Sequence, residues 1–159
     1  VEGAVTEEVV YADWLDFETE MLPLNFKYHK NWYFTQYKGE AVEIYSSFFG
    51  FGDDAQILSE EEGFDPSELF KIELITLKKD KNEELYSQLK DSNNYKDAED
   101  IVMGDLKGVK VTEKFFDMNN IVIWGEKDDT LYLLRAFNAE ENGIEDIVEM
   151  MAYTFNFTE

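Results

Sequence analysis

The sequence predicts an α+β domain built mainly from antiparallel strands. Short segments of alternating apolar and polar residues recur along the chain, and short connections join several of them, which favours antiparallel pairing. Two other segments carry apolar residues at helical spacing. The chain has 159 residues, 44% hydrophobic and 16% aromatic, so it can bury a core and does not have the composition of a disordered protein.

Two strands are predicted in the first half of the chain. Residues 42–48 alternate, and residues 69–77 alternate apolar with charged side chains. A helix beginning near Asp65 is the alternative for the second segment, because Asp65-Pro66-Ser67-Glu68 has the residues of a capped helix start. We favour the strand, since the alternation is longer than any helical stripe in this region.

The second half of the chain adds a strand, a hairpin and two helices. Residues 109–115 alternate, and residues 121–124 and 131–134 form a predicted hairpin around 125–130. Amphipathic helices are expected over residues 81–90 and 143–153, the second with Asn142 and Glu145 as a capping pair. We expect the inward-facing residues to share one core: Val42, Ile44, Phe48, Ile72, Leu74, Val109, Val111, Ile123, Leu133, Ile147 and Met151.

The domain organisation is simple. Residues 1–12 are acidic and lack periodicity, which indicates a linker or a loosely docked arm, and residues 13–159 are expected to form a single domain. Because the sequence begins at Val1 instead of Met, we expect that further residues precede it in the precursor, where a signal peptide or a lipid-anchor cysteine would lie.

Charge and composition exclude several functions. The net charge of −22 disfavours binding to nucleic acid or directly to an anionic membrane, and it would attract cations or a basic partner. The sequence contains no cysteine, which excludes disulfides, thiolate metal sites and thiol nucleophiles. The single histidine, His29, lies beside Tyr28 and Trp32 and is interpreted as a turn residue next to packed aromatic side chains, not as a catalytic base.

One acidic segment is the candidate metal site. Calcium takes several oxygen ligands, and this segment supplies carboxylates without a nearby lysine, although it has no EF-hand spacing. The alternative is a solvated acidic loop, which predicts that removing two of the charges is neutral or slightly stabilising. The candidate ligands are Asp53, Asp54, Glu60, Glu61, Glu62 and Asp65.

Four segments together resemble the PsbP-like family of extrinsic photosystem proteins and bacterial lipoproteins. They are residues 24–32, where Tyr28 and Trp32 match and His29 replaces a proline, the Gly104–Gly108 segment, residues 131–134, and the ending Phe155-Asn156-Phe157. The resemblance extends from Trp14 to Phe157. It implies a central, mainly antiparallel sheet packed against helices, and functions that are largely non-enzymatic.

The resemblance leads to a specific functional expectation. We expect a non-catalytic, exported bacterial domain, the folded part of a lipoprotein, which acts outside the cytoplasm by binding an unknown protein or small ligand without a resident cofactor. Two alternatives remain open. The charge of −22 suggests an acidic nucleic-acid mimic or immunity-type protein, and the abundance of carboxylates suggests a carboxylate-dependent hydrolase.

Overall fold

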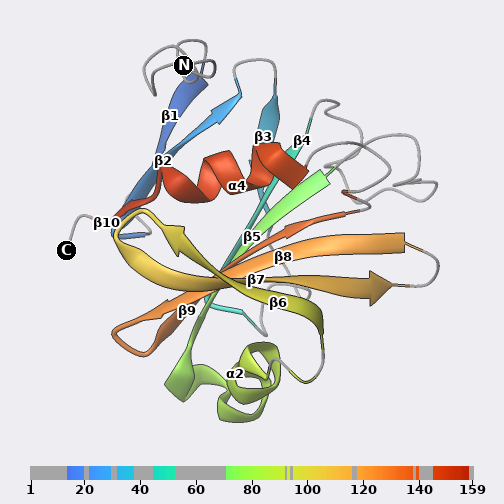
Figure 1. Ribbon diagram of the computed structural model, residues 1–159. Helices are drawn as coiled ribbons and strands as arrows, with labels where there is room; N and C mark the ends of the chain where they lie inside the picture. The colour runs from blue at the N-terminus through green and yellow to red at the C-terminus, as the bar shows by residue number, and fades with distance from the viewer. Residues whose placement is uncertain are drawn as a thin grey trace.

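The structure is a computed structural model that describes residues 14–19, 22–29, 32–37, 45–52, 71–91, 93, 95–115, 118–137, 139 and 145–157. Within these residues the strands form two antiparallel sheets, one of three strands in the order β1-β2-β10 and one of seven strands in the order β3-β4-β5-β9-β8-β7-β6 (Figure 1). The expected α+β fold with a mainly antiparallel sheet is confirmed.

The described elements follow one another without a long repeat. The strands are β1 (Trp14–Glu18), β2 (Leu24–His29), β3 (Tyr33–Gln36), β4 (Ser47–Gly52), β5 (Lys71–Lys78), β6 (Lys96–Met103), β7 (Leu106–Phe115), β8 (Met118–Lys127), β9 (Thr130–Ala136) and β10 (Asn156–Phe157). The helices are the short 3₁₀-helix η3 (Lys79–Lys81), α2 (Glu83–Lys90) and α4 (Glu145–Tyr153). None of the described helices is long and apolar enough to cross a membrane.

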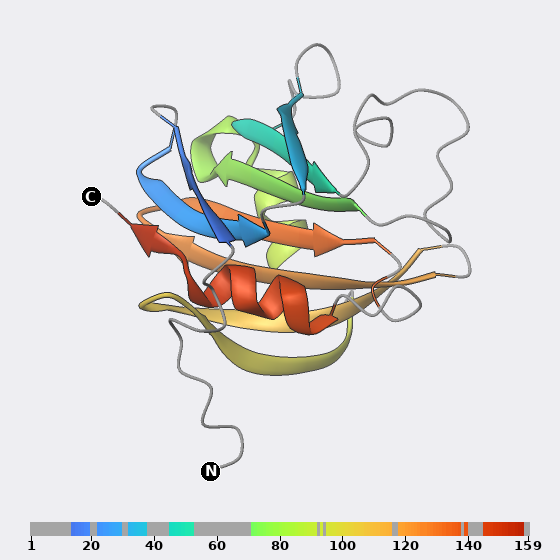
Figure 2. The same cartoon turned by 90° about the horizontal axis from the view of Figure 1, so that it is seen from above.

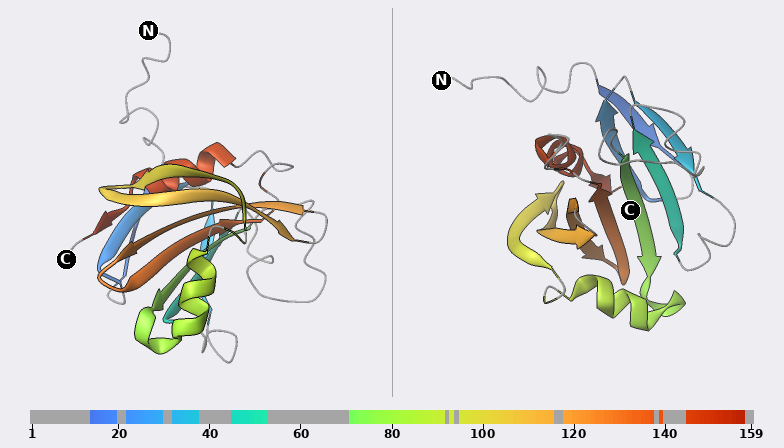
Figure 3. Two further views of the ribbon diagram at one scale, coloured as in Figure 1. Left: turned by 60° about the horizontal axis from the view of Figure 1, so that its bottom comes forward. Right: turned by 90° about the vertical axis from the view of Figure 1, so that its right-hand side faces the viewer.

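The seven-stranded sheet is covered on both faces. Helix α4 and the three-stranded sheet lie against one face, and α2 lies against the other (Figures 2 and 3). This arrangement explains why β5 is buried from Lys71 to Leu77: a central strand covered on both sides has no solvent-facing residues.

The two faces carry separate hydrophobic cores, so the expectation of one shared core is wrong. Ile72, Leu74, Ile123 and Met151 pack with the aromatic residues of β1, β2 and β4 on the α4 face. On the α2 face, a second cluster includes the other expected residues Phe48, Val111 and Leu133. Val109 and Ile147 are only partly buried, and Val42 and Ile44 lie outside the described residues. The period-2 pattern identifies inward positions but not which face of a doubly covered strand they occupy.

The expected strands are present with shifted bounds. The structure places a strand, not a helix, at β5, in agreement with the alternation over residues 69–77. The strand expected over residues 42–48 begins only at Ser47 and continues to Gly52, after bends at Tyr45 and Ser46. Near the end of β4, Gly50 lies directly against the Tyr37 ring, where a larger residue would clash.

Two tight turns fix the register of the β6–β9 region. The β8–β9 hairpin was expected to turn over residues 125–130, but both strands extend further, and only Asp128 and Asp129 form the turn, at φ 52° and 58°. Positive φ at both central residues is typical of a type I′ turn. The β6–β7 hairpin turns at Gly104 and Asp105, with Gly104 at φ 64°, as a type II′ turn requires.

Helix α2 begins at a defined cap. The Asn82 side chain accepts a hydrogen bond of 3.0 Å from the Leu85 N–H, as Asn does at helix N-caps. Tyr86 is the buried residue of this helix, and Leu85 and Leu89 are partly buried against the same cluster. The Tyr86 hydroxyl donates a hydrogen bond to Glu126, which satisfies the polar end of a buried ring.

Candidate functional site

The acidic segment expected to bind a cation cannot be placed. Asp53, Asp54, Glu60, Glu61, Glu62 and Asp65 lie outside the described residues, and so does the expected arm over residues 1–12. Among the residues that the structure does describe, no three His, Asp or Glu side chains are grouped so that they could hold a metal ion. Calcium binding by the acidic segment therefore stays a prediction.

The single histidine lies in an aromatic cluster. The His29 ring stacks on Trp32, with ring centres 5.7 Å apart, and meets Trp14 edge-on at 6.1 Å. Trp32 is 8% exposed and belongs to the core of the α4 face. His29 thus ends β2 beside packed aromatic rings, the surroundings that the sequence indicated.

A groove lies between the edge strand β6 and helix α4. Its volume is about 510 Å³, within the range of ligand sites in proteins. We call it the β6–α4 groove, and its lining residues are Glu99, Asp100, Ile101, Val102, Lys107, Gly108, Glu149 and Tyr153. A second hollow of about 290 Å³ shares Glu99, includes Asp97, Lys110 and Glu145, and extends across β7 to β8.

An ion cluster lies next to this groove and shares Glu149 with it. Lys110 on β7 is only 8% exposed, and it lies opposite Glu99 in the β6–β7 register. Glu145 and Glu149 are four residues apart on α4, so both carboxylates face the same side of the helix, and both bind Lys110 Nζ, Glu149 at 2.6 Å. The cluster therefore joins α4 to the sheet.

The electrostatics of this cluster keep Lys110 charged. Burial alone would lower the pKa of Lys110, but its hydrogen bonds to Glu145 and Glu149 outweigh the burial and raise the pKa above its ordinary value. A lysine acts as a nucleophile or base only when it loses its proton near neutral pH. Lys110 consequently serves as a fixed positive charge between α4 and the sheet, in the lining of the second hollow.

The rim of the groove is partly apolar. Val102 and Tyr153 are 49% and 43% exposed, and both line the groove. The Tyr153 hydroxyl donates to Glu149 at 3.3 Å. Partial burial, together with the nearby Glu149 carboxylate, raises the pKa of Tyr153, so its hydroxyl stays protonated at neutral pH. The groove thus offers an aromatic ring and carboxylates side by side.

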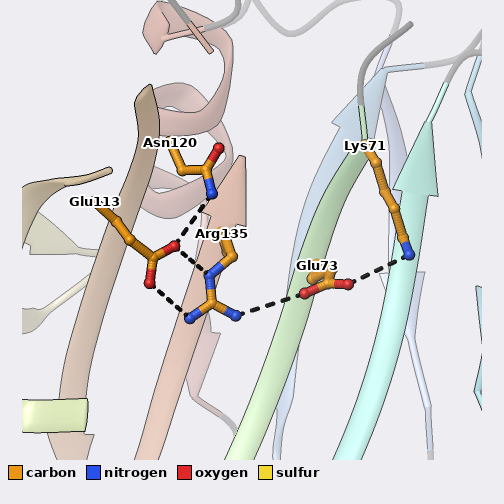
Figure 4. Close-up of polar contacts among 5 residues, drawn as sticks. All are labelled: Lys71, Glu73, Glu113, Asn120 and Arg135. Atoms are coloured by element: carbon orange, nitrogen blue, oxygen red, sulfur yellow. Dashed lines mark hydrogen bonds and ion pairs between the residues drawn. The ribbon is translucent and has the colours of Figure 1, made fainter. Parts of the chain in front are cut away.

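A chain of buried charges crosses the α2 face of the sheet (Figure 4). Lys71 Nζ lies 3.3 Å from Glu73 Oε2, and the other Glu73 oxygen lies 3.6 Å from Arg135. Arg135 donates to both Glu113 oxygens, from Nε at 2.9 Å and from Nη2 at 3.2 Å, and the Asn120 amide donates to Glu113 at 3.2 Å. We call this the charge ladder.

The charged groups of the charge ladder pair with one another. Glu73 has a cation against each of its oxygens, and Glu113 accepts a bidentate guanidinium, which is the strongest pairing available to a carboxylate. Burial raises the pKa of Glu73, an effect that Lys71 and Arg135 oppose. A raised carboxyl pKa also occurs in catalytic acids, but a proton-transfer group needs an oxygen open to its substrate.

The sequence reasoning missed both of these features. No strand was predicted over residues 96–103, although Ile101-Val102-Met103, a Gly-Asp pair and Leu106 form a recognisable hairpin pattern. The charge ladder left no local signal, because the β5 pair Lys71 and Glu73 is far in sequence from Glu113 and Arg135 and meets them only through strand order.

Comparison with known proteins is informative about the fold alone. No family profile matches the sequence, and no curated protein matches it. The fold is similar to the solution structure of cyanobacterial PsbP (CyanoP) from Synechocystis sp. PCC 6803, with a TM-score of 0.55 and 10% identity over 92% of this chain and 93% of that chain.

A second solved structure supports the same conclusion. A crystal structure of a protein from Bacteroides thetaiotaomicron VPI-5482 is similar with a TM-score of 0.51 and 11% identity, and the match covers 92% of this chain but 49% of that chain. This chain therefore spans about half the length of the Bacteroides protein. The chain has a PsbP-like α+β fold.

Proposed function

We propose that the chain is a non-catalytic PsbP-like domain that works outside the cytoplasm and binds a protein partner through the β6–α4 groove. The observation that carries this proposal is the groove itself: an open hollow along the last described strand of the large sheet, with exposed apolar side chains at its rim. Exposed aromatic and aliphatic side chains at the edge of a concave surface are typical of binding sites.

The state of the ionisable groups favours binding over catalysis. Lys110 is held charged between two carboxylates, and the oxygens of Glu73 and Glu113 face cations. These groups serve to join helices and strands. A carboxylate-dependent hydrolase would instead need two carboxyl groups facing a common substrate position.

The proposed location rests on the family resemblance. In the PsbP-like family, extrinsic proteins and lipoproteins are common, and we propose that this domain is likewise exported and held at the cell envelope by a lipid anchor. Metabolic labelling of the full-length precursor in its host with a radioactive fatty acid tests the anchor. Labelled protein in the membrane fraction is the expected result, and unlabelled protein in the cytosol would contradict the proposal.

The binding role is tested by site-specific photo-crosslinking in the same host. A photoreactive amino acid at Val102 is compared with one at Leu15, which is exposed to a similar extent, 49% against 45%, but lies on the three-stranded sheet. We expect one partner, identified by mass spectrometry, to be captured from Val102 and not from Leu15, and to bind again when both proteins are purified. Equal capture from both positions would contradict the assignment of the groove.

A further inference from the structure

The backbone of β6 has one edge turned away from the sheet. β6 is the last strand in the order of the seven-stranded sheet. The β6–β7 hairpin has a two-residue turn, so its flanking pair, Met103 and Leu106, exchanges backbone hydrogen bonds. The N–H and C=O groups of successive residues point to opposite edges of a strand. Those of Ile101 and Met103 therefore point toward β7, whereas those of Asp100 and Val102 point outward.

This outer edge is accessible. The side chains from Lys96 to Asp100 are exposed, and Val102 is 49% exposed. The first hollow borders β6 from Glu99 to Val102, and the second borders it at Asp97 and Glu99 before it extends across β7 to β8. Space is therefore open beside β6 between Asp97 and Val102.

The charges along β6 select the occupant of this edge. Asp97, Glu99 and Asp100 are exposed on the strand, and Glu145 and Glu149 line the two hollows. Three lysines oppose these five carboxylates: Lys96 on the strand, and Lys107 and Lys110 in the lining, so carboxylates are in excess. A second copy of β6 would bring carboxylates against carboxylates, and a bulge at Asp97, with φ 55°, further interrupts the edge. Charge and bulges are the devices that prevent edge strands from pairing with themselves. A basic segment meets no such repulsion.

We propose that β6 accepts an extended, lysine- or arginine-rich segment of the partner protein as an added strand, an inference that rests on the proposed binding role of the groove. The added strand takes its backbone hydrogen bonds from Asp100 and Val102. Its side chains on the α4 side lie beside Glu99, Glu149 and the exposed Tyr153 ring, where a cation meets both carboxylates and an aromatic face.

The test uses the full chain and a short labelled peptide of alternating lysine and valine. Binding is measured by fluorescence anisotropy, and backbone protection by hydrogen exchange. The same peptide with every amide N-methylated keeps its charge but cannot form a strand, so it reports the general attraction of a protein with net charge −22. We expect the unmodified peptide to bind more tightly and to slow exchange at Asp100 and Val102, while Ile101 and Met103 do not change.

Two variants test separately how the backbone hydrogen bonds and the carboxylate charges of β6 contribute to peptide binding. Val102→Pro removes one outward N–H at an edge position where proline is tolerated, and should weaken binding about fivefold. Glu99→Gln with Asp100→Asn should also weaken it. The control, Asp80→Asn with Glu83→Gln, removes the same charge at exposed positions in η3 and α2 and should leave affinity within about twofold. Thermal unfolding verifies that each variant is folded.

Three results would overturn strand addition. They are equal affinity for the two peptides, unchanged exchange at Asp100 and Val102 with peptide bound, and a dimer of the chain that Val102→Pro dissociates, which would make a second copy the occupant. If the peptides behave alike while crosslinking at Val102 still captures a partner, strand addition fails and the proposed function stands. If Val102 captures nothing, the proposed function fails as well.

Discussion

Gly104 is the residue at which a single methyl group should have the largest effect. Its φ of 64° costs about 1–2 kcal/mol for a residue with a Cβ atom. In addition, a Cβ atom at this position would lie 1.9 Å from the Phe155 carbonyl oxygen, where ordinary contact begins near 3.4 Å. The β6–β7 turn and the segment before β10 would have to separate by about 1.5 Å, and such overpacking costs about 1–3 kcal/mol. Gly104→Ala should therefore destabilise the fold by about 2–5 kcal/mol.

Denaturant unfolding followed by circular dichroism measures this free energy. Asp128→Ala is the control, because Asp128 already carries a Cβ atom at positive φ, 52°, and lies exposed in a turn. This substitution adds neither a new Cβ atom nor a clash, so Gly104→Ala should exceed it by about 2–5 kcal/mol. Equal destabilisation by the two substitutions would show that neither the positive φ nor the Phe155 contact makes Gly104 necessary.

Three further substitutions test the interior. Arg135→Met leaves Glu113 without its cation and Glu73 with Lys71 alone, so the free energy of unfolding measured in denaturant should fall by about 3–5 kcal/mol. A loss below about 1 kcal/mol would mean that the charge ladder is well solvated. Trp32→Ala should cost about 3–5 kcal/mol in the same assay, and a change within about 0.5 kcal/mol would reject its place in the core. Hydrogen bonds from Lys90 and Tyr86 lower the pKa of Glu126 in the folded state. The Glu126 carboxylate therefore stabilises the fold at pH values above its unfolded-state pKa near 4.5, and this stabilisation is lost as the pH falls through the folded-state pKa. Glu126→Gln removes this carboxylate, so the variant should lose less stability than the wild type when the pH is lowered. The difference in the free energy of unfolding should be below about 1 kcal/mol, because the side chains of Lys90 and Glu126 are both over a third exposed. Thermal unfolding at several pH values measures it, and identical pH profiles of the two proteins would contradict the prediction.

Local patterns predicted much of the secondary structure. The β5 alternation, the β8–β9 hairpin and the α4 stripe each follow from neighbouring residues, because side-chain direction repeats every two residues in a strand and every 3.6 in a helix. The glycines that supported the family resemblance have a cause in the packing of the strands. Gly108 lies where a Cβ atom would meet the Trp124 carbonyl at 2.7 Å, so packing between neighbouring strands requires it.

The candidate site was not predictable in the same way. The acidic residues that the sequence singled out were chosen for density of charge, whereas the groove depends on which strand ends the sheet and where α4 crosses it. Glu99 and Lys110 face each other only through the β6–β7 register, and Glu145 and Glu149 reach Lys110 only after α4 has packed. Contacts of this kind have no signature within a short window of sequence.

The sequence by itself determined the fold class, the strongly acidic character and the absence of thiol chemistry, since composition and periodicity are properties of the chain alone. Tertiary structure decided the rest. Strand order divided one expected core into two, because a sheet covered on both faces buries alternate residues in opposite directions. It also brought Lys71, Glu73, Arg135 and Glu113 into one row and left β6 at the edge. Long-range pairing sets these positions, and pairing is a property of the whole fold.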